Sequence, residues 1–68
     1  MSTTANYTVT GMTCGHCAAS VTEEVSEIPG VSDVQVALET GVVTVTSEQP
    51  LEESQVRDAV TEAGYQLV

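Results

Sequence analysis

The sequence contains no lysine and a single arginine, Arg57, against ten acidic residues. Its formal net charge of -9 means that phosphate backbones and anionic lipid surfaces would repel the chain. Nucleic-acid binding is therefore not expected. Electrostatic attraction would instead speed the encounter with a basic partner surface.

Long hydrophobic runs are also absent. No stretch is apolar and long enough to cross a bilayer, and the first ten residues, MSTTANYTVT, lack the basic start and apolar core of a secretory signal. We therefore expect a cytoplasmic protein without direct membrane insertion. Because cytosolic thiols are kept reduced, the two cysteines are expected to bind a metal or carry out redox chemistry rather than to form a structural disulfide.

The chain is short and poor in large aromatic residues, with 68 residues, two Tyr and neither Phe nor Trp. A chain of this length has room for one small hydrophobic core, and abundant Val and Thr favour strands. We expect a single domain over residues 1–68, in which residues 1–5 form a flexible N-terminus.

Apolar and polar residues alternate in several segments, which is the period of half-buried strands. The predicted strands cover residues 6–10, 31–39, 42–47 and 65–68. In the two middle strands, the positions expected to face the core are Val34, Val36, Leu38, Val43 and Val45. A hairpin turn containing Gly41 joins these two strands, since glycine supplies the positive φ that such turns require.

Two other segments have apolar residues at the helical spacing of three and four. The first helix begins at Gly15 and ends at Pro29-Gly30, and its apolar stripe consists of Cys17, Val21, Val25 and Ile28. The second helix covers about residues 52–63, and its stripe consists of Leu51, Val56, Ala59, Val60 and Ala63, followed by Gly64 as a C-terminal stop. The order of elements predicts an α+β fold of the ferredoxin-like βαββαβ type. Such an open-faced sandwich has a four-stranded antiparallel sheet with both helices on one face.

The motif GMTCGHC, residues 11–17, holds both cysteines and the only histidine. Cys14 is predicted in the loop after the first strand and Cys17 in the first turn of the first helix. Amide groups there have no intrahelical acceptor, and the positive end of the helix dipole favours thiolates. Thiol pKa values in such positions range from about 3.5 to about 7.5, compared with about 8.5 for free cysteine. A thiolate either binds metal or attacks a disulfide, so the pKa alone leaves both chemistries open.

The number of ligands that the motif offers favours Cu(I) over zinc. Structural zinc takes four tetrahedral ligands, whereas the motif offers two sulfurs and one imidazole, that of His16, lodged between them. Two soft thiolates suit Cu(I), which accepts low coordination, and an open site leaves room for an incoming ligand. A small dithiol oxidoreductase has the same CxxC spacing and is the alternative. No crossover strand precedes the motif and no proline separates the cysteines, so we expect a carrier rather than an enzyme.

The GMTCGHC motif after a strand, PGV at residues 29–31 and AGY at residues 63–65 resemble the heavy-metal-associated domain family, most closely its free-standing bacterial copper chaperones. The resemblance covers residues 6–68 and implies Cu(I) bound by Cys14 and Cys17. It also implies transfer by ligand exchange to the soluble metal-binding domain of a copper-exporting P-type ATPase. A copper-bridged homodimer is a further expectation, and an excised N-terminal domain of such an ATPase is a further alternative. The acidic helix residues are then a solvated face or a docking surface.

Three residues near the motif are candidates for auxiliary roles. Met12 has a soft thioether, but its place beside a loop favours packing over ligation. His16 is expected at the surface, and three alternatives are open for it. It has no role, it lowers the thiol pKa values when protonated, or it becomes a third ligand when two molecules share copper. Tyr65 either fills the end of the core or, as the resemblance implies, shields the metal loop.

Overall fold

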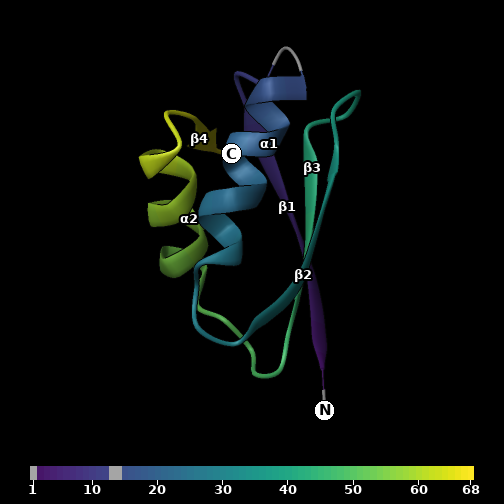
Figure 1. The fold of residues 1–68 in the computed structure, drawn as a ribbon, viewed down its shortest axis with the longest axis vertical. Helices are drawn as coiled ribbons and strands as arrows, with labels where there is room; N and C mark the ends of the chain where they lie inside the picture. Colours follow the sequence, from purple (N-terminus) through teal and green to yellow (C-terminus); the bar gives the residue numbers. More distant parts are fainter. Residues whose placement is uncertain (1, 13–14) are drawn as a thin grey trace.

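The structure, a computed structural model, describes residues 2–12 and 15–68. Its elements are β1 (Thr3–Thr10), α1 (Gly15–Ser26), β2 (Val31–Ala37), β3 (Val42–Ser47), α2 (Glu53–Glu62) and β4 (Gln66–Leu67). The strands pair antiparallel in the order β2-β3-β1-β4. Both helices lie side by side on the same face of this sheet (Figure 1). The predicted ferredoxin-like α+β fold is therefore confirmed.

The core is built almost entirely of valine. Its fully buried side chains are Val21, Val25, Val43, Val45, Val56 and Val60. β-branched side chains are stiff and pack well on a pleated sheet, and burying each stabilises the fold by roughly 1.5 to 3 kcal/mol. Val21 and Val25 continue the stripe that begins at Cys17. The packing that anchors α1 to the sheet therefore also sets the orientation of its first turn.

The turn between β2 and β3 is held against the end of β1. The backbone N–H of Val9 donates to the carbonyl oxygen of Gly41 at 2.8 Å. Gly41 has a φ of 75°, and a Cβ atom at this position would lie 2.6 Å from the Val9 oxygen. Only glycine fits this close approach without a shift of the backbone. The contact fixes β1 shortly before the chain enters the motif.

Two predictions about strand limits are wrong. The first strand does not begin at residue 6: Thr3 to Ala5, which the sequence predicts as part of a flexible N-terminus, continue β1 and pair with Val45 to Ser47 of β3. Leu38 does not face the core. The strand β2 ends at Ala37, and Leu38 lies in the following turn with 37% of its surface exposed. The alternation of apolar and polar residues continues through Leu38 and Glu39, although strand pairing ends at Ala37.

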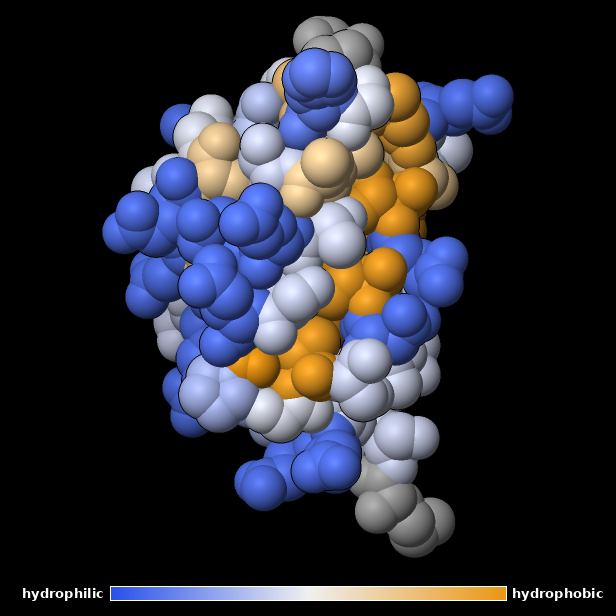
Figure 2. Space-filling view, viewed as in Figure 1, coloured by the Kyte–Doolittle hydropathy of each residue, from blue (hydrophilic) through white to orange (hydrophobic). Residues whose placement is uncertain are grey.

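The surface combines a charged helical side with a partly apolar seam. Hydrophilic residues gather over α2, while an apolar band follows the boundary between α1 and β2 (Figure 2). Arg57 donates to Glu53 at 2.6 Å, but both side chains are more than half exposed, so the pair adds little stability. Apart from this pair, α2 carries the acidic residues Asp58 and Glu62, so the helix has a net negative charge. Within the described residues, no helix has the length and apolar character needed to span a membrane.

Candidate metal centre

The chain leaves β1 through Gly11 and Met12 and enters α1 at Gly15. Gly11 has a φ of 92°, which turns the backbone away from the strand direction. The predicted ligand Cys14 lies outside the described residues. The structure therefore describes the two ends of the motif, from Gly11 to Met12 and from Gly15 to Cys17.

Cys17 is the third residue of α1 and lies in its first turn. Its side chain is half-buried, at the start of the stripe that continues through the buried Val21 and Val25. Within Gly15–Ser26, no acidic residue occupies the first turn, although the whole chain carries a net charge of -9. The amide groups and the dipole at this helix end stabilise a negative sulfur, and no neighbouring carboxylate in the turn opposes them. The position predicted for Cys17 is confirmed, and its environment fits a soft, thiolate-bound cation.

His16 precedes Cys17 in the same turn, and its side chain is exposed. This agrees with the surface position predicted from the sequence. Gly15, which begins the helix, is exposed as well, and no heavy atom would lie within 4 Å of a Cβ atom there. The first turn of α1 is therefore open to solvent on the side of these two residues. Across residues 2–12 and 15–68, no three His, Cys, Asp or Glu side chains are grouped to hold one ion.

Met12 is half-buried and packs against the hydrophobic core. This contact confirms the expected packing of Met12, and that its thioether does not ligate stays a prediction. Because Met12 lies two residues before Cys14 in the sequence, its packing ties the first half of the motif to the domain interior. The flexible thioether fills irregular gaps of this kind well.

Tyr65 connects the end of α2 to the motif. Its backbone N–H donates to the carbonyl oxygen of Val60 at 3.1 Å, and its half-buried ring packs against the core. A Cβ atom at Gly11 would lie 3.3 Å from Tyr65 Cδ1, so the ring lies directly against the Gly11 backbone. The ring therefore packs at the end of the core, as predicted, and also reaches the Gly11 backbone, while its shielding of the metal loop stays a prediction. Sequence reasoning missed the role of Gly11, although a glycine directly after a strand is a signal for a close backbone approach.

Comparison with known proteins agrees with this arrangement. The family model for the heavy-metal-associated domain matches residues 6–66. The copper chaperone CopZ of Staphylococcus aureus (strain bovine RF122 / ET3-1) is 39% identical over 61 residues, which cover 88% of this chain and 90% of that protein.

Two solved structures have the same fold. A structure of the CopZ metallochaperone is 36% identical with a TM-score of 0.90, and the match covers 97% of this chain and 100% of that one. A copper binding domain from HMA7, a P-type ATPase, is 28% identical with a TM-score of 0.88, covering 100% and 92%. The resemblance predicted from the motif is confirmed, and the chain belongs to the heavy-metal-associated domain family.

Proposed function

We propose that this chain is a Cu(I) metallochaperone in which Cys14 and Cys17 hold the ion as thiolates. The observation that carries the proposal is the place of Cys17 in the first turn of α1, half-buried and without a carboxylate in that turn. The role of Cys14 rests on the CxxC spacing. The names of the similar proteins, copper chaperone CopZ and CopZ metallochaperone, support copper as the cargo.

Cu(I) fits this ligand set better than Zn(II) does. The motif supplies two sulfurs, whereas a structural zinc site takes four ligands. A soft monovalent ion accepts two thiolates, and the resulting unit carries a net negative charge. The amide groups at the start of α1 stabilise that charge, in a chain that has no lysine to do so.

Transfer proceeds by ligand exchange without a change in oxidation state. A thiolate of the acceptor forms a bond to Cu(I), and the bond to one of the two donor sulfurs then breaks. A second exchange releases the other sulfur, and each freed thiolate keeps its electron pair and can take up a proton. The exposed side of the first turn, at Gly15 and His16, is the route by which the incoming sulfur approaches. Since only bonds between copper and its sulfur ligands change, and no covalent bond of a substrate molecule is made or broken, the protein acts as a carrier and not as an enzyme.

The acceptor that fits this chemistry is the soluble metal-binding domain of a copper-exporting P-type ATPase. The likeness to a copper binding domain of a P-type ATPase supports it, because two related sites can exchange an ion through shared thiolates. Such exchange requires reduced thiols, as the cytoplasm provides. Two copies of this chain can form a copper-bridged homodimer in the same way, by sharing an ion between the thiolates of both copies. An N-terminal domain of such an ATPase would use the same metal chemistry while attached to the transporter.

The test is an anaerobic titration of the reduced protein with Cu(I) against a competing chelator. The wild type should capture copper stoichiometrically, and the variant with both Cys14→Ser and Cys17→Ser should lose this binding. Ser20→Ala, an exposed change on the same helix, is the matched control and should bind like the wild type. Undiminished binding by the double variant would overturn the proposed site. Disulfide turnover without stoichiometric copper binding would instead support the oxidoreductase.

A further inference from the structure

β4 covers only the last part of the β1 edge. It pairs with Val9 and Thr10, and the N–H of Val68 donates to the carbonyl oxygen of Thr8 at 2.8 Å. Within residues 2–12 and 15–68, no strand pairs with β1 between Thr3 and Tyr7 on this side (Figure 1). The first half of β1 is therefore an open sheet edge.

The direction of the backbone groups on this edge follows from two hydrogen bonds. The Val9 N–H points toward Gly41, on the side of β3, and the Thr8 carbonyl points toward Val68, on the side of β4. Backbone groups alternate between the two sides along a strand. Thr4 and Asn6 therefore direct their N–H and C=O groups to the open edge, where an added strand can bond to them.

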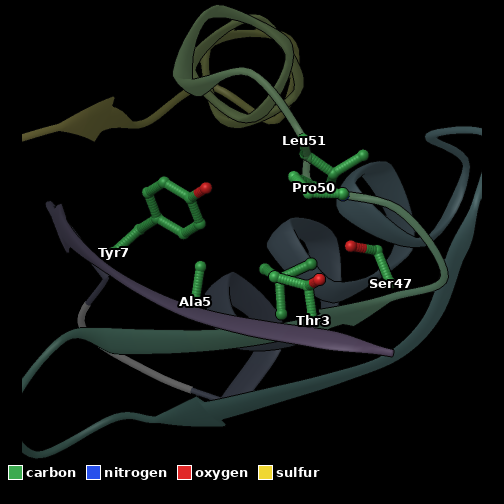
Figure 3. A pocket seen from close by; sticks show the side chains of 7 residues that line it. Thr3, Ala5, Tyr7, Ser47, Pro50 and Leu51 are labelled. Carbon is green, nitrogen blue, oxygen red and sulfur yellow. The ribbon is translucent and has the colours of Figure 1, made fainter. Parts of the chain in front are cut away.

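A pocket of about 60 Å³ lies beside this open edge. Thr3, Ala5 and Tyr7 extend into it from β1 toward Pro50 and Leu51, which precede α2 (Figure 3). The pocket is too small for a drug-sized ligand, because pockets for such ligands measure roughly 300 to 1,000 Å³. Its volume suits a single aliphatic side chain. In an added antiparallel strand, the residue opposite Ala5 points to the same face as Ala5, and so into the pocket. The small methyl group of Ala5 leaves room for it.

Charge decides what kind of strand fits here. Ser47, which lines the pocket, is followed by the exposed Glu48, and Leu51 is followed by the exposed Glu52. The whole chain carries a net charge of -9, so a second copy would be repelled and a basic segment attracted. The open part of β1 itself is uncharged and contains no proline, the residue that commonly protects a sheet edge.

We propose that the open half of β1 and this pocket form a docking site for an extended basic segment of a partner protein. The segment adds antiparallel to β1, bonds to Thr4 and Asn6, and places an aliphatic side chain opposite Ala5, with Lys or Arg beside it. The site goes beyond copper binding, because it lies toward the N-terminal end of β1, away from the first turn of α1 (Figure 1). A partner held there leaves Cys17 accessible for ligand exchange.

The probe is the acetylated and amidated peptide Lys-Thr-Leu-Thr-Lys, titrated into the reduced, metal-free full chain and followed by amide NMR. The proposal predicts saturable shifts at Thr4, Asn6 and Leu51, and binding that weakens as salt rises because opposite charges are screened. The acidic analogue Glu-Thr-Leu-Thr-Glu should not bind. Shifts confined to the start of α1, or no saturable shifts at all, would overturn the proposal.

Two variants test the edge and the pocket separately. Asn6→Pro removes the N–H that faces the open edge but no β1–β3 bond, and should weaken peptide binding by about tenfold or more. Asn6→Thr is its matched control, because both variants lose the 2.9 Å bond from the Thr44 hydroxyl to Asn6 while only threonine keeps the N–H. Ala5→Leu fills the pocket and should also abolish binding, which keeps the proposal testable if Asn6→Pro fails to fold.

Equal peptide binding by the wild type and Ala5→Leu would overturn the pocket assignment.

Sedimentation of the peptide-free protein tests whether a second copy of the chain occupies the open edge. A monomer at all salt concentrations supports a basic partner as the occupant. A dimer that forms at high salt and is lost in Asn6→Pro would instead identify a second copy as the occupant and contradict the proposal.

Discussion

The ring of Tyr65 lies against the backbone of Gly11, because a Cβ atom built on Gly11 would be 3.3 Å from Tyr65 Cδ1. The contact joins the segment after α2 to the exit of β1, two regions that are far apart in the sequence. Since Met12 follows Gly11 and packs on the core, the start of the metal motif is held from two sides. The stability of this end of the molecule should therefore depend on residues that are not ligands.

Gly11→Ala should destabilise the protein. The φ of 92° at Gly11 is unfavourable for alanine by about 1 to 2 kcal/mol, and the added methyl group must also displace the Tyr65 ring. Gly15→Ala is the matched control, because its Cβ meets no atom within 4 Å and alanine favours helix by up to about 1 kcal/mol. Denaturant unfolding of the two metal-free variants measures the difference. Equal stabilities would contradict the Gly11 contact.

Tyr65→Ala should lower the free energy of unfolding by about 2 kcal/mol, less than the loss of a fully buried aromatic ring, because Tyr65 is half-buried. It should also speed the withdrawal of Cu(I) by a chelator, since the Gly11 backbone at the start of the motif loses the ring that packs against it. Tyr65→Phe keeps the ring and should resemble the wild type in both measurements. A phenylalanine variant as impaired as the alanine variant would show that the hydroxyl, and not the ring contact, is responsible.

His16→Ala should slow alkylation of the thiols at neutral pH and raise their pKa values. The exposed imidazole lies next to Cys17 in the first turn, so its protonated form stabilises a thiolate there. His16→Lys preserves a positive charge and should restore the reactivity. Titration of the alkylation rate against pH is the measurement, and superimposable curves for the wild type and His16→Ala would exclude an electrostatic role.

Copper affinity should increase with pH. Thiols must lose their protons to bind Cu(I), so protons compete with the ion below the thiol pKa values and no longer do so above them. Competition titrations at several pH values should therefore show affinity rising through the thiol pKa range and then levelling off. The Cys14→Ser, Cys17→Ser variant should fail to capture copper at every one of these pH values. A flat profile down to the pH of acid unfolding would argue against thiolate ligands.

Most of the fold could be predicted from the spacing of apolar residues. The stripe through Val21 and Val25 is buried as expected, and Val43 and Val45 face the core. These positions are predictable because burial requires one apolar face per element. The alternating pattern predicts the wrong position for Leu38 because it does not show where backbone pairing stops, and Leu38 follows the last paired residue.

Features that depend on tertiary contacts were not predictable in the same way. The pairing of Thr3 with Ser47 extends β1 toward the N-terminus, but no run of apolar residues marks this segment. Ser47 is buried at 3% exposure, and its hydroxyl donates to the carbonyl of Gln49 at 2.6 Å, so a polar residue occupies an inward position of β3. For the site, the CxxC motif predicted the helix position of Cys17, whereas the ring against Gly11 required the folded chain.

Copper X-ray absorption spectroscopy on the reduced protein, loaded with one equivalent of Cu(I), tests the proposed metal site directly. We expect a cuprous edge and a first coordination shell made of the sulfurs of Cys14 and Cys17, lost in the double serine variant. A first shell of nitrogen and oxygen atoms, or one unchanged by the loss of both cysteines, would contradict the proposed site.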